Sequence, residues 1–411
     1  MARKTTGMIQ PEGSLPVPLP KGFRFSTAKA GIKASGRADL AFVQACAGTT
    51  AAALFTKNKV VAAPVSVGRV SLTRTRGHVR AVIVNSGNAN CATGVPGLRA
   101  CKKICDEVGR LLDVRREEVF PSSTGIIGVP LPTEKIMSAL PGLVSGSAAT
   151  EDAFRQFAHA ILTTDTRAKI SAGSFHVGNK KVTIAGVAKG AGMIHPQLAT
   201  MLVYVFTDVA ASPAELKRSL TQACRESFNC ISIDGDTSTN DTVLLLASGE
   251  SGASLADPMV RQEFNDGLTS ICQSLSRQIV ADGEGVQHVI RLHIEQARSR
   301  KEALAVAQAI SRSLLVKTAW AGADPNWGRI LAAIGASGLP IDPDRVDIFI
   351  GKQKVCRSGV NYPFNESHAH SELAKPESDI KIRLRRGSSS LTFLTTDLTV
   401  EYVRVNADYS T

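Results

Sequence analysis

Long apolar runs are missing from this 411-residue sequence. None approaches the roughly 18 consecutive apolar residues that a membrane-spanning helix needs. The N-terminal residues 1–23 also lack the continuous apolar stretch of a signal peptide, and they have too few Arg residues and too little amphipathic pattern for a transit peptide. We therefore expect a soluble cytoplasmic protein without a membrane partner.

Aromatic residues are scarce, at 5% of the chain, so the stacking platforms that RNA or single-strand binders use are few. The formal net charge is +12 and is unevenly distributed: residues 1–199 carry 26 Lys and Arg against 11 Asp and Glu, whereas residues 200–411 carry 22 against 25. The basic residues are spread singly and do not cluster. This pattern argues against a nucleic-acid partner, because a positive field serves an anionic small molecule or cofactor equally well.

Motifs for metal and nucleotide binding are also missing. The sequence has no CxxC spacing, no HExxH and no P-loop. Its eight cysteines are scattered along a chain without a secretion signal, which predicts free thiols and not a disulfide framework.

Two stretches come closest to a metal site, and neither suffices. In the acidic turn Ser232–Thr242, Thr239 stands where a calcium-binding EF-hand loop requires Gly, and Leu245 stands where it requires Glu. His368 and His370 have no nearby third ligand, so a solvated loop is the favoured interpretation. We expect neither a bound metal nor a bound cofactor.

The residues that are present indicate a globular protein of the α/β or α+β class. Apolar residues make up 43% of the chain and charged residues 20%, which is enough to bury a large core. From about Gly31 onward, short apolar strands alternate with helical stretches of mixed charge. The pattern toward the C-terminus predicts a main domain over residues 1–285 and a smaller domain over residues 286–411.

The junction Ala199-Thr200 joins a loop rich in Gly and Pro to the apolar run Met201–Phe206, which is predicted to be a buried strand. A Thr hydroxyl becomes an effective nucleophile when chain cleavage makes the residue N-terminal, because its own α-amine then serves as the base. Taken alone, the stretch is better explained by a β-branched residue at the start of a strand.

A second stretch, "FPSSTGIIG" at Phe120–Gly128, is predicted to be a Ser/Thr/Gly turn. Its backbone N–H groups could converge on an oxyanion. Taken alone, an ordinary turn is the better interpretation.

Longer motifs run through nearly the whole chain. They are, in order, "GIKASGRADLAFV", "LFTKNKVVAAPV", "VNSGNANCATG", "SSTGIIG", "TTDT", "AKGAGMI", "LATML", "SIDGDTSTNDT", "DGEG", "NWGRILAAIG" and "NADYST". Together they resemble the ornithine acetyltransferase family, also called glutamate N-acetyltransferases, of the cyclic route to arginine. Motifs of this length in this order are specific, and they reverse the interpretation of Thr200.

The resemblance implies a precursor that cuts itself between Ala199 and Thr200 into an α chain (1–199) and a β chain (200–411) that stay associated. It implies that Thr200 accepts the acetyl group of N-acetylornithine as an ester and passes it to the amine of glutamate. The implied fold is an αββα sandwich of two sheets between helices, like that of N-terminal-nucleophile hydrolases, plus a smaller C-terminal domain. The usual assembly is a heterotetramer of two α and two β chains.

The resemblance also assigns the site. Thr124 and Gly125 are expected to form the oxyanion hole. The substrate contacts are expected from six residues: Thr163, Lys189, Thr200, Glu284, Asn406 and Thr411. These residue types suit the chemistry, since Lys can hold a carboxylate, Glu can pair with an ornithine ammonium, and Asn and Thr supply neutral hydrogen bonds.

One position departs from the family pattern. Where Asn-Met usually precedes the Ala-Thr junction, this chain has Gln197 and Leu198. Gln is longer than Asn by one methylene group. The difference concerns the local turn geometry and the cleavage rate, and it leaves the nucleophile in place.

Two other functions stay open at this stage. An N-terminal-nucleophile amidase or peptidase of related fold would use Thr200 with water in place of glutamate; Lys189 and Glu284 favour the transferase, because a glutamate acceptor needs a cation that a simple hydrolase does not. A non-enzymatic basic binding protein is the third function, and an intact 43.5 kDa chain after purification would favour it. The residues also leave open acetyl-CoA as a second donor, which would make the enzyme bifunctional.

The junction predicts that the purified protein runs as two fragments of about 21 and 22 kDa, in proportion to their residue counts. N-terminal sequencing of the second fragment should begin at Thr200. Thr200→Ala should stay a single chain, because the hydroxyl that attacks the Ala199 carbonyl is gone, and Thr200→Ser should retain some cleavage. Sequencing that returned only Met1 or Ala2 would exclude self-cleavage.

Overall fold

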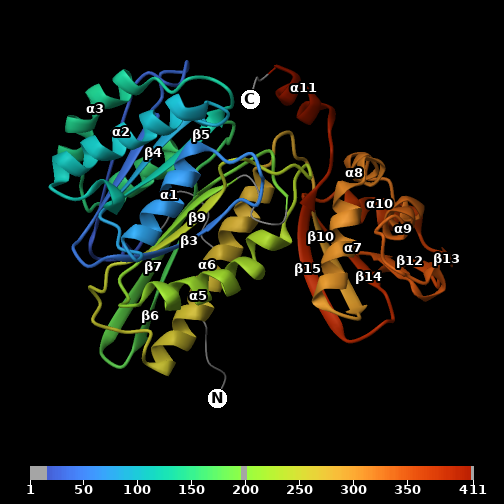
Figure 1. Cartoon of the computed structure of the whole chain (residues 1–411). Helices are drawn as coiled ribbons and strands as arrows, with labels where there is room; N and C mark the ends of the chain where they lie inside the picture. The colour runs from blue at the N-terminus through green and yellow to red at the C-terminus, as the bar shows by residue number, and fades with distance from the viewer. Residues whose placement is uncertain (1–15, 196–200, 409–411) are drawn as a thin grey trace.

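The computed structural model describes residues 16–195 and 201–408, and its strands form three sheets. Two of the sheets face each other and share a buried core, while helices cover their outer faces. The third sheet lies beside them with helices of its own (Figure 1). This arrangement confirms the predicted mixed α/β class and its αββα sandwich.

The first sheet has the order β1-β2-β4-β5, and only its last pair is parallel. Its strands are β1 (Phe23–Ala28), β2 (Leu40–Ala45), β4 (Ala81–Asn88) and β5 (Val119–Ile126). The outer face is covered by α2 (Gly94–Leu112) and α3 (Thr133–Ser145), and α1 (Ala63–Arg74) packs along β5. Leu40, Phe42 and Ile83 are buried beneath these helices.

Strand β5 corrects one prediction. The stretch Phe120–Gly128 was expected to be a turn, but residues up to Ile126 are in the strand. The Pro, Ser, Thr and Gly residues of this stretch are typical of turns when read alone. The parallel pairing with β4 nevertheless keeps this backbone extended to the edge of the sheet.

The second sheet has the order β3-β9-β8-β7-β6, with β8 and β9 parallel. Its strands are β3 (Thr50–Phe55), β9 (Thr242–Ala247), β8 (Leu202–Thr207), β7 (Lys180–Lys189) and β6 (Lys169–Val177). Every residue of β8 and β9 is buried, as expected for central strands covered on both faces. The buried strand predicted directly after the Ala199-Thr200 junction is therefore confirmed.

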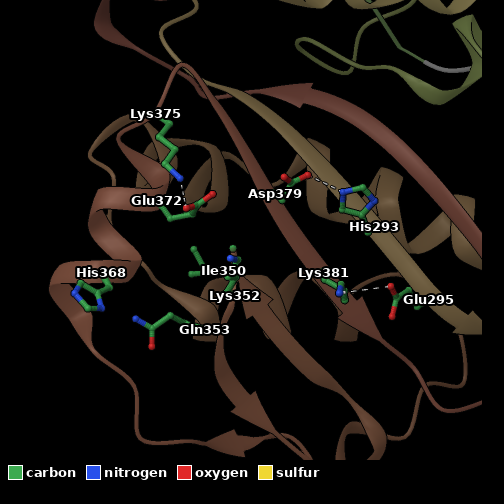
Figure 2. Close-up of a pocket in the computed structure, with 11 residues that line it drawn as sticks. His293, Glu295, Ile350, Lys352, Gln353, His368, Glu372, Lys375, Asp379 and Lys381 are labelled. Atoms are coloured by element: carbon green, nitrogen blue, oxygen red, sulfur yellow. Dashed lines mark hydrogen bonds and ion pairs between the residues drawn. The ribbon is translucent and has the colours of Figure 1, made fainter.

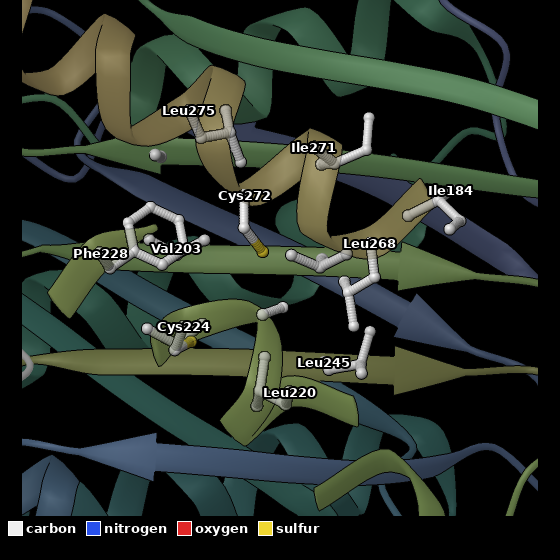
Figure 3. Close-up of a cluster of buried hydrophobic side chains, with 14 of the residues drawn as sticks. Ile184, Val203, Leu220, Cys224, Phe228, Leu245, Leu268, Ile271, Cys272 and Leu275 are labelled. Carbon is white, nitrogen blue, oxygen red and sulfur yellow. The ribbon is translucent and has the colours of Figure 1, made fainter. Parts of the chain in front are cut away.

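Two helices, α5 (Pro213–Arg225) and α6 (Pro258–Ala281), cover the outer face of the second sheet. Figure 3 shows their apolar side chains directed onto the strands. Leu220 comes from α5 and Leu268 from α6, and both pack with Leu245 of β9 in one buried cluster.

Aromatic side chains fill the space between the two sheets. Thr150, followed by two acidic residues, predicts the start of a helix, and it caps α4 (Glu151–Ala160) by accepting a hydrogen bond from Ala153 N. This helix supplies Phe154 and Phe157 to the layer. The ring of Phe206 in β8 lies 5.1 Å from that of Phe25 in β1, centroid to centroid, in an edge-to-face contact. The layer thus joins residues that precede the 199/200 junction to residues that follow it.

The third sheet has the order β13-β12-β11-β14-β10-β15. Its strands are β10 (Val289–Ala297), β11 (Asp347–Ile350), β12 (Gln353–Arg357), β13 (Val360–Asn361), β14 (Glu377–Arg383) and β15 (Ser389–Thr396). Its helices are α7 (Arg300–Arg312), α8 (Leu314–Ala321), α9 (Trp327–Gly335) and α10 (Glu366–Leu373). These elements enclose a separate apolar core, and all of them follow residue 286; the division into two domains there stays a prediction.

Two further predictions for this region were wrong. The helical spacing after Ser299 predicts one long helix. The structure has two helices there, because Ser313 adopts an extended conformation and caps α8 by accepting a hydrogen bond from Val316 N. His368 and His370 lie on helix α10 and not in a loop. Asn365 caps that helix, so a polar loop signal at this point marked a helix start.

The last helix, α11 (Val400–Asp408), returns from the third sheet toward the two-sheet body (Figure 1). Within the described part of the chain, no helix has the length and apolar character needed to span a bilayer. All eight cysteines lie among the described residues and are free thiols, as predicted.

Removing the Phe206 ring should destabilise the protein strongly. Phe206→Ala leaves a cavity between the sheets and should lower the free energy of unfolding by about 3–5 kcal/mol. Met259→Ala is the matched control, because that side chain is 69% exposed. Thermal melting of both variants decides the point: equal melting temperatures would mean that the aromatic layer does not hold the sheets together.

Candidate active site

A cavity of ≈ 240 Å³ lies where the ends of β5 and β7 meet the loop after α6 and helix α11. Six of the predicted site residues line it: Thr124, Gly125, Thr163, Lys189, Glu284 and Asn406. They come from separate stretches on both sides of the 199/200 junction. The three other predicted positions, Ala199, Thr200 and Thr411, lie outside the described residues.

The end of β5 is shaped by Gly125. Its φ is +131°, and a Cβ at this position would lie 2.3 Å from the carbonyl carbon of Gly87, so only glycine fits. The β4–β5 register also shifts here, between Gly87 and Asn88. A bulge of this kind turns the backbone out of the regular ladder, as often happens beside active sites. Thr124 and Gly125 are thereby presented to the cavity.

Lys189 is the last residue of β7 and pairs with Leu202, the first residue of β8. It is 4% exposed, and its Nζ donates a hydrogen bond to Thr124 Oγ1 at 3.2 Å. Burial lowers the pKa of Lys189, and the nearby carboxylate of Asp165 opposes this effect. The arrangement places one buried amine beside the predicted oxyanion hole.

Glu284 and helix α11 close the opposite side of the cavity. Asn406 Nδ2 donates to Glu284 Oε2 at 2.9 Å. Thr399 Oγ1 donates to the carbonyl oxygen of Gly285 at 2.7 Å, at the start of the helix. An acidic group therefore faces the cavity together with the buried Lys189, a combination that can bind an amino acid through both its charged ends.

Sequence reasoning missed three groups near the cavity: Asp234, Asp241 and Tyr402. Asp234 accepts backbone hydrogen bonds from Met193 N at 2.5 Å and Ile194 N at 2.9 Å, and Tyr402 OH donates to it at 3.3 Å. Burial raises the pKa of Asp234 to about 6. Asp234 belongs to the acidic turn that lacks the Gly and Glu of a calcium-binding loop. Nothing in the sequence indicated that its carboxylate binds backbone amides.

Asp241 binds the backbone that follows the junction. Its Oδ1 accepts a hydrogen bond from Met201 N at 2.9 Å, and the residue is 1% exposed. Burial raises the pKa of this carboxyl well above its usual range. Two carboxyl groups of one turn thus hold the backbone on both sides of residues 196–200.

No group of three His, Cys, Asp or Glu side chains in residues 16–195 and 201–408 could hold a metal ion. A larger hollow of ≈ 950 Å³ on the third sheet is lined mainly by acidic and basic side chains, with His368 at its rim (Figure 2). These side chains pair mainly with one another: Lys375 with Glu372, His293 with Asp379, and Lys381 with Glu295. None of the six predicted site residues lines this hollow.

The protein is of the mixed α/β class, with two facing sheets between helices and with a buried Lys and an acidic side chain at one polar cavity. The ArgJ family model matches residues 24–411. Curated "Arginine biosynthesis bifunctional protein ArgJ" sequences are similar: that of Methylococcus capsulatus is 42% identical over 95% of each chain, and that of Geobacter sulfurreducens is 43% identical over 95% of this chain and 99% of its own. The solved ornithine acetyltransferase of Mycobacterium tuberculosis, complexed with ornithine, is 39% identical over 44% of this chain and 94% of its own, with a TM-score of 0.41.

The chain belongs to the ArgJ family. It is an acyltransferase of arginine biosynthesis, as its sequence motifs predicted.

The contact between Gly192 and Glu284 offers a test of the cavity. A Cβ on Gly192 would lie 2.5 Å from Glu284 Oε2, so Gly192→Ala should displace that carboxylate while leaving the fold intact. Gly173→Ala is the control, since its Cβ would meet no atom within 4 Å. We expect kcat/KM for acyl transfer to fall at least tenfold in Gly192→Ala and to stay unchanged in Gly173→Ala, with both melting temperatures near that of the wild type. Full activity in Gly192→Ala would remove Glu284 from the site.

Proposed function

We propose that this chain is a self-processing acetyltransferase that moves the acetyl group of N-acetylornithine to glutamate through an acetyl ester on Thr200. The observation that carries the proposal is that six residues, all assigned to the site by one family resemblance, line a single cavity in a chain of the ArgJ family. Residues with no common role would have no reason to meet there from both halves of the sequence.

The charges of the cavity suit both substrates. N-acetylornithine and glutamate each present a carboxylate, which the buried Lys189 can bind as a point charge. Glu284, held by Asn406, can pair with the ammonium of ornithine. Thr163 adds a neutral hydrogen-bonding group to the lining of the same cavity. One pocket can therefore serve the donor and the acceptor in turn.

The nucleophile in this proposal is Thr200, the residue directly before Met201. Self-cleavage gives it a free α-amine, which acts as its general base. Asp241 supports this placement by binding Met201 N. The α chain 1–199 and β chain 200–411 stay together because β7 and β8 belong to the same sheet.

The reaction then has two balanced halves. The Thr200 hydroxyl attacks the acetyl carbonyl, its proton passes to the α-amine, and the C–N bond breaks as ornithine leaves with that proton. The amine of glutamate next attacks the ester carbonyl, and the Thr200 oxygen leaves with the proton returned. Thr124 and Gly125 stabilise the negative oxygen of both tetrahedral intermediates, where the loss of one donor typically costs about 10²–10³ in rate.

Acetyl-CoA as a second donor, the heterotetramer of two α and two β chains and the cytoplasmic location are parts of the same proposal. The basic α chain, with 26 Lys and Arg against 11 Asp and Glu, would favour an anionic donor such as acetyl-CoA. Assays of acetyl transfer to glutamate from N-acetylornithine and, separately, from acetyl-CoA decide whether the enzyme uses one donor or two.

Incubation with N-acetylornithine alone should produce a β chain heavier by one acetyl group on Thr200, because ornithine must leave before glutamate can attack. Intact-mass measurement of the 200–411 chain detects it, and double-reciprocal plots should give parallel lines. Acetate release that is as fast without glutamate as glutamate acetylation is with it would instead indicate an amidase. Intersecting lines without an acetylated chain would indicate direct transfer in a ternary complex.

A further inference from the structure

A buried network of three charges lies directly beneath the cavity. Lys169, the first residue of β6, is fully buried, and its Nζ donates to Asp165 Oδ1 at 2.6 Å and to Asp282 Oδ2 at 2.5 Å. The two carboxylate side chains are themselves 0% and 3% exposed. Asp165 and Asp282 stand in the motifs "TTDT" and "DGEG", but the sequence analysis assigned a role to none of the three residues.

Each carboxylate of the network also binds the backbone of a segment that supplies the cavity. Asp165 accepts a hydrogen bond at 2.6 Å from the N–H of Gly190, the residue directly after Lys189. It accepts another at 3.1 Å from the N–H of Thr163. Asp282 accepts one from Thr166 N at 3.1 Å and lies two residues before Glu284. The network therefore connects the three segments that carry Thr163, Lys189 and Glu284.

Stability alone does not explain such a network. Removing three charged side chains from water is expensive, and well-packed apolar residues of similar volume often stabilise a core equally well or better. The position of the network gives a more specific reason. Asp165 Oδ2 lies 4.0 Å from Lys189 Nζ, so this carboxylate interacts with two ammonium groups at once.

The electrostatic effect on Lys189 can be assigned to individual groups. The titratable side chains that act on it are Asp165, Lys169, Glu284, Asp241 and Lys33. Burial lowers the pKa of Lys189, Asp165 raises it, and Lys169 lowers it. Burial raises the pKa of the Asp165 carboxyl, but Lys189 and Lys169 together outweigh burial and hold this pKa well below its usual range. Asp165 thus stays ionised and stabilises the charged form of the lysine.

We propose that Asp165, Lys169 and Asp282 form a positioning network that fixes Lys189 at the base of the cavity and keeps its ammonium group charged for binding the substrate carboxylate. This inference rests on the proposed function for the role of Lys189. It assigns to Asp165 the electrostatic part, and to Lys169 and Asp282 the task of holding Asp165 in place.

The pH dependence of kcat/KM for N-acetylornithine tests the network, since it reports ionisations of the free enzyme and free donor. Activity should fall at high pH as Lys189 loses its proton. Asp165→Asn removes the carboxylate charge beside Lys189 and should move this alkaline limb to lower pH by about one unit or more. The titration of the substrate is the same for every variant, so a shift between variants belongs to the enzyme.

Two variants of the same network give different expectations. Lys169→Met removes a like charge and should move the alkaline limb to higher pH, the direction opposite to Asp165→Asn. Asp282→Asn removes a carboxylate that acts on Lys189 only by holding Asp165 in place, so it should shift the limb to lower pH by less than Asp165→Asn does. A purely structural role would lower activity in all three variants without shifts of opposite sign.

Lys189→Arg keeps a positive charge at every accessible pH, so only the titration of the donor's own ammonium should remain in its alkaline limb. If the limb of this variant stays at its wild-type position, or if Asp165→Asn and Asp282→Asn shift it equally, the proposal is wrong. The Lys169→Met and Lys189→Arg results decide the matter should Asp165→Asn fail to fold.

A second readout needs no turnover. Competitive labelling with acetic anhydride, followed by mass spectrometry of the peptide that contains Lys189, gives the titration midpoint of that amine directly. The midpoint should fall in Asp165→Asn and rise in Lys169→Met, and identical midpoints would overturn the network. If the wild-type enzyme lacks transfer activity but the variants still show these midpoint shifts, the proposed function is wrong and the network is supported.

Discussion

The antiparallel pairing of β7 with β8 is the interaction on which the rest of the structure depends. It runs from Ile184 opposite Thr207 to Lys189 opposite Leu202, and both strands lie in the middle of the second sheet. The pairing brings Lys189 and Leu202 to the same end of the sheet. The cavity forms there because the end of β5, in the facing sheet, reaches it from the other side.

The acidic turn between residues 232 and 242 provides the second constraint. Its Asp234 binds the backbone amides of residues 193 and 194, and its Asp241 binds that of residue 201. The carboxylates that resembled a cation site therefore have backbone N–H groups as their partners. These contacts hold the backbone at residues 193–194 and at residue 201, on both flanks of the proposed cleavage site.

The sequence predicted much of this from strong local patterns. The run Met201–Phe206 is apolar at every position and could only be a buried strand, and Thr150 before two acidic residues marked a helix start. The site residues that line the cavity were predicted from the motifs of a known family, not from local physics. Two local signals misled. The Gly- and Ser-rich end of β5 stays extended because it pairs with β4. Ser313 ends one helix and caps the next within a sequence whose spacing is helical throughout.

The buried network could not be predicted in this way. Asp165 and Lys169 are four residues apart and look like a surface ion pair, while Asp282 is more than a hundred residues away. Their effect on Lys189 depends on their being buried, and a sequence gives no reason to expect buried Asp and Lys, because these residues are usually exposed. Groups of this kind become visible only when the fold brings the three segments together.

The shared sheet also has a consequence for folding kinetics. In the uncut chain, β7 and β8 are neighbours, and their pairing closes a loop of about a dozen residues, which is fast. In the proposed mature form, cut at 199/200, the same pairing must form between two separate chains, so refolding becomes a second-order process whose rate depends on concentration. The mature protein would then persist because it unfolds slowly, and a molecule that has come apart would depend on meeting another fragment to recover.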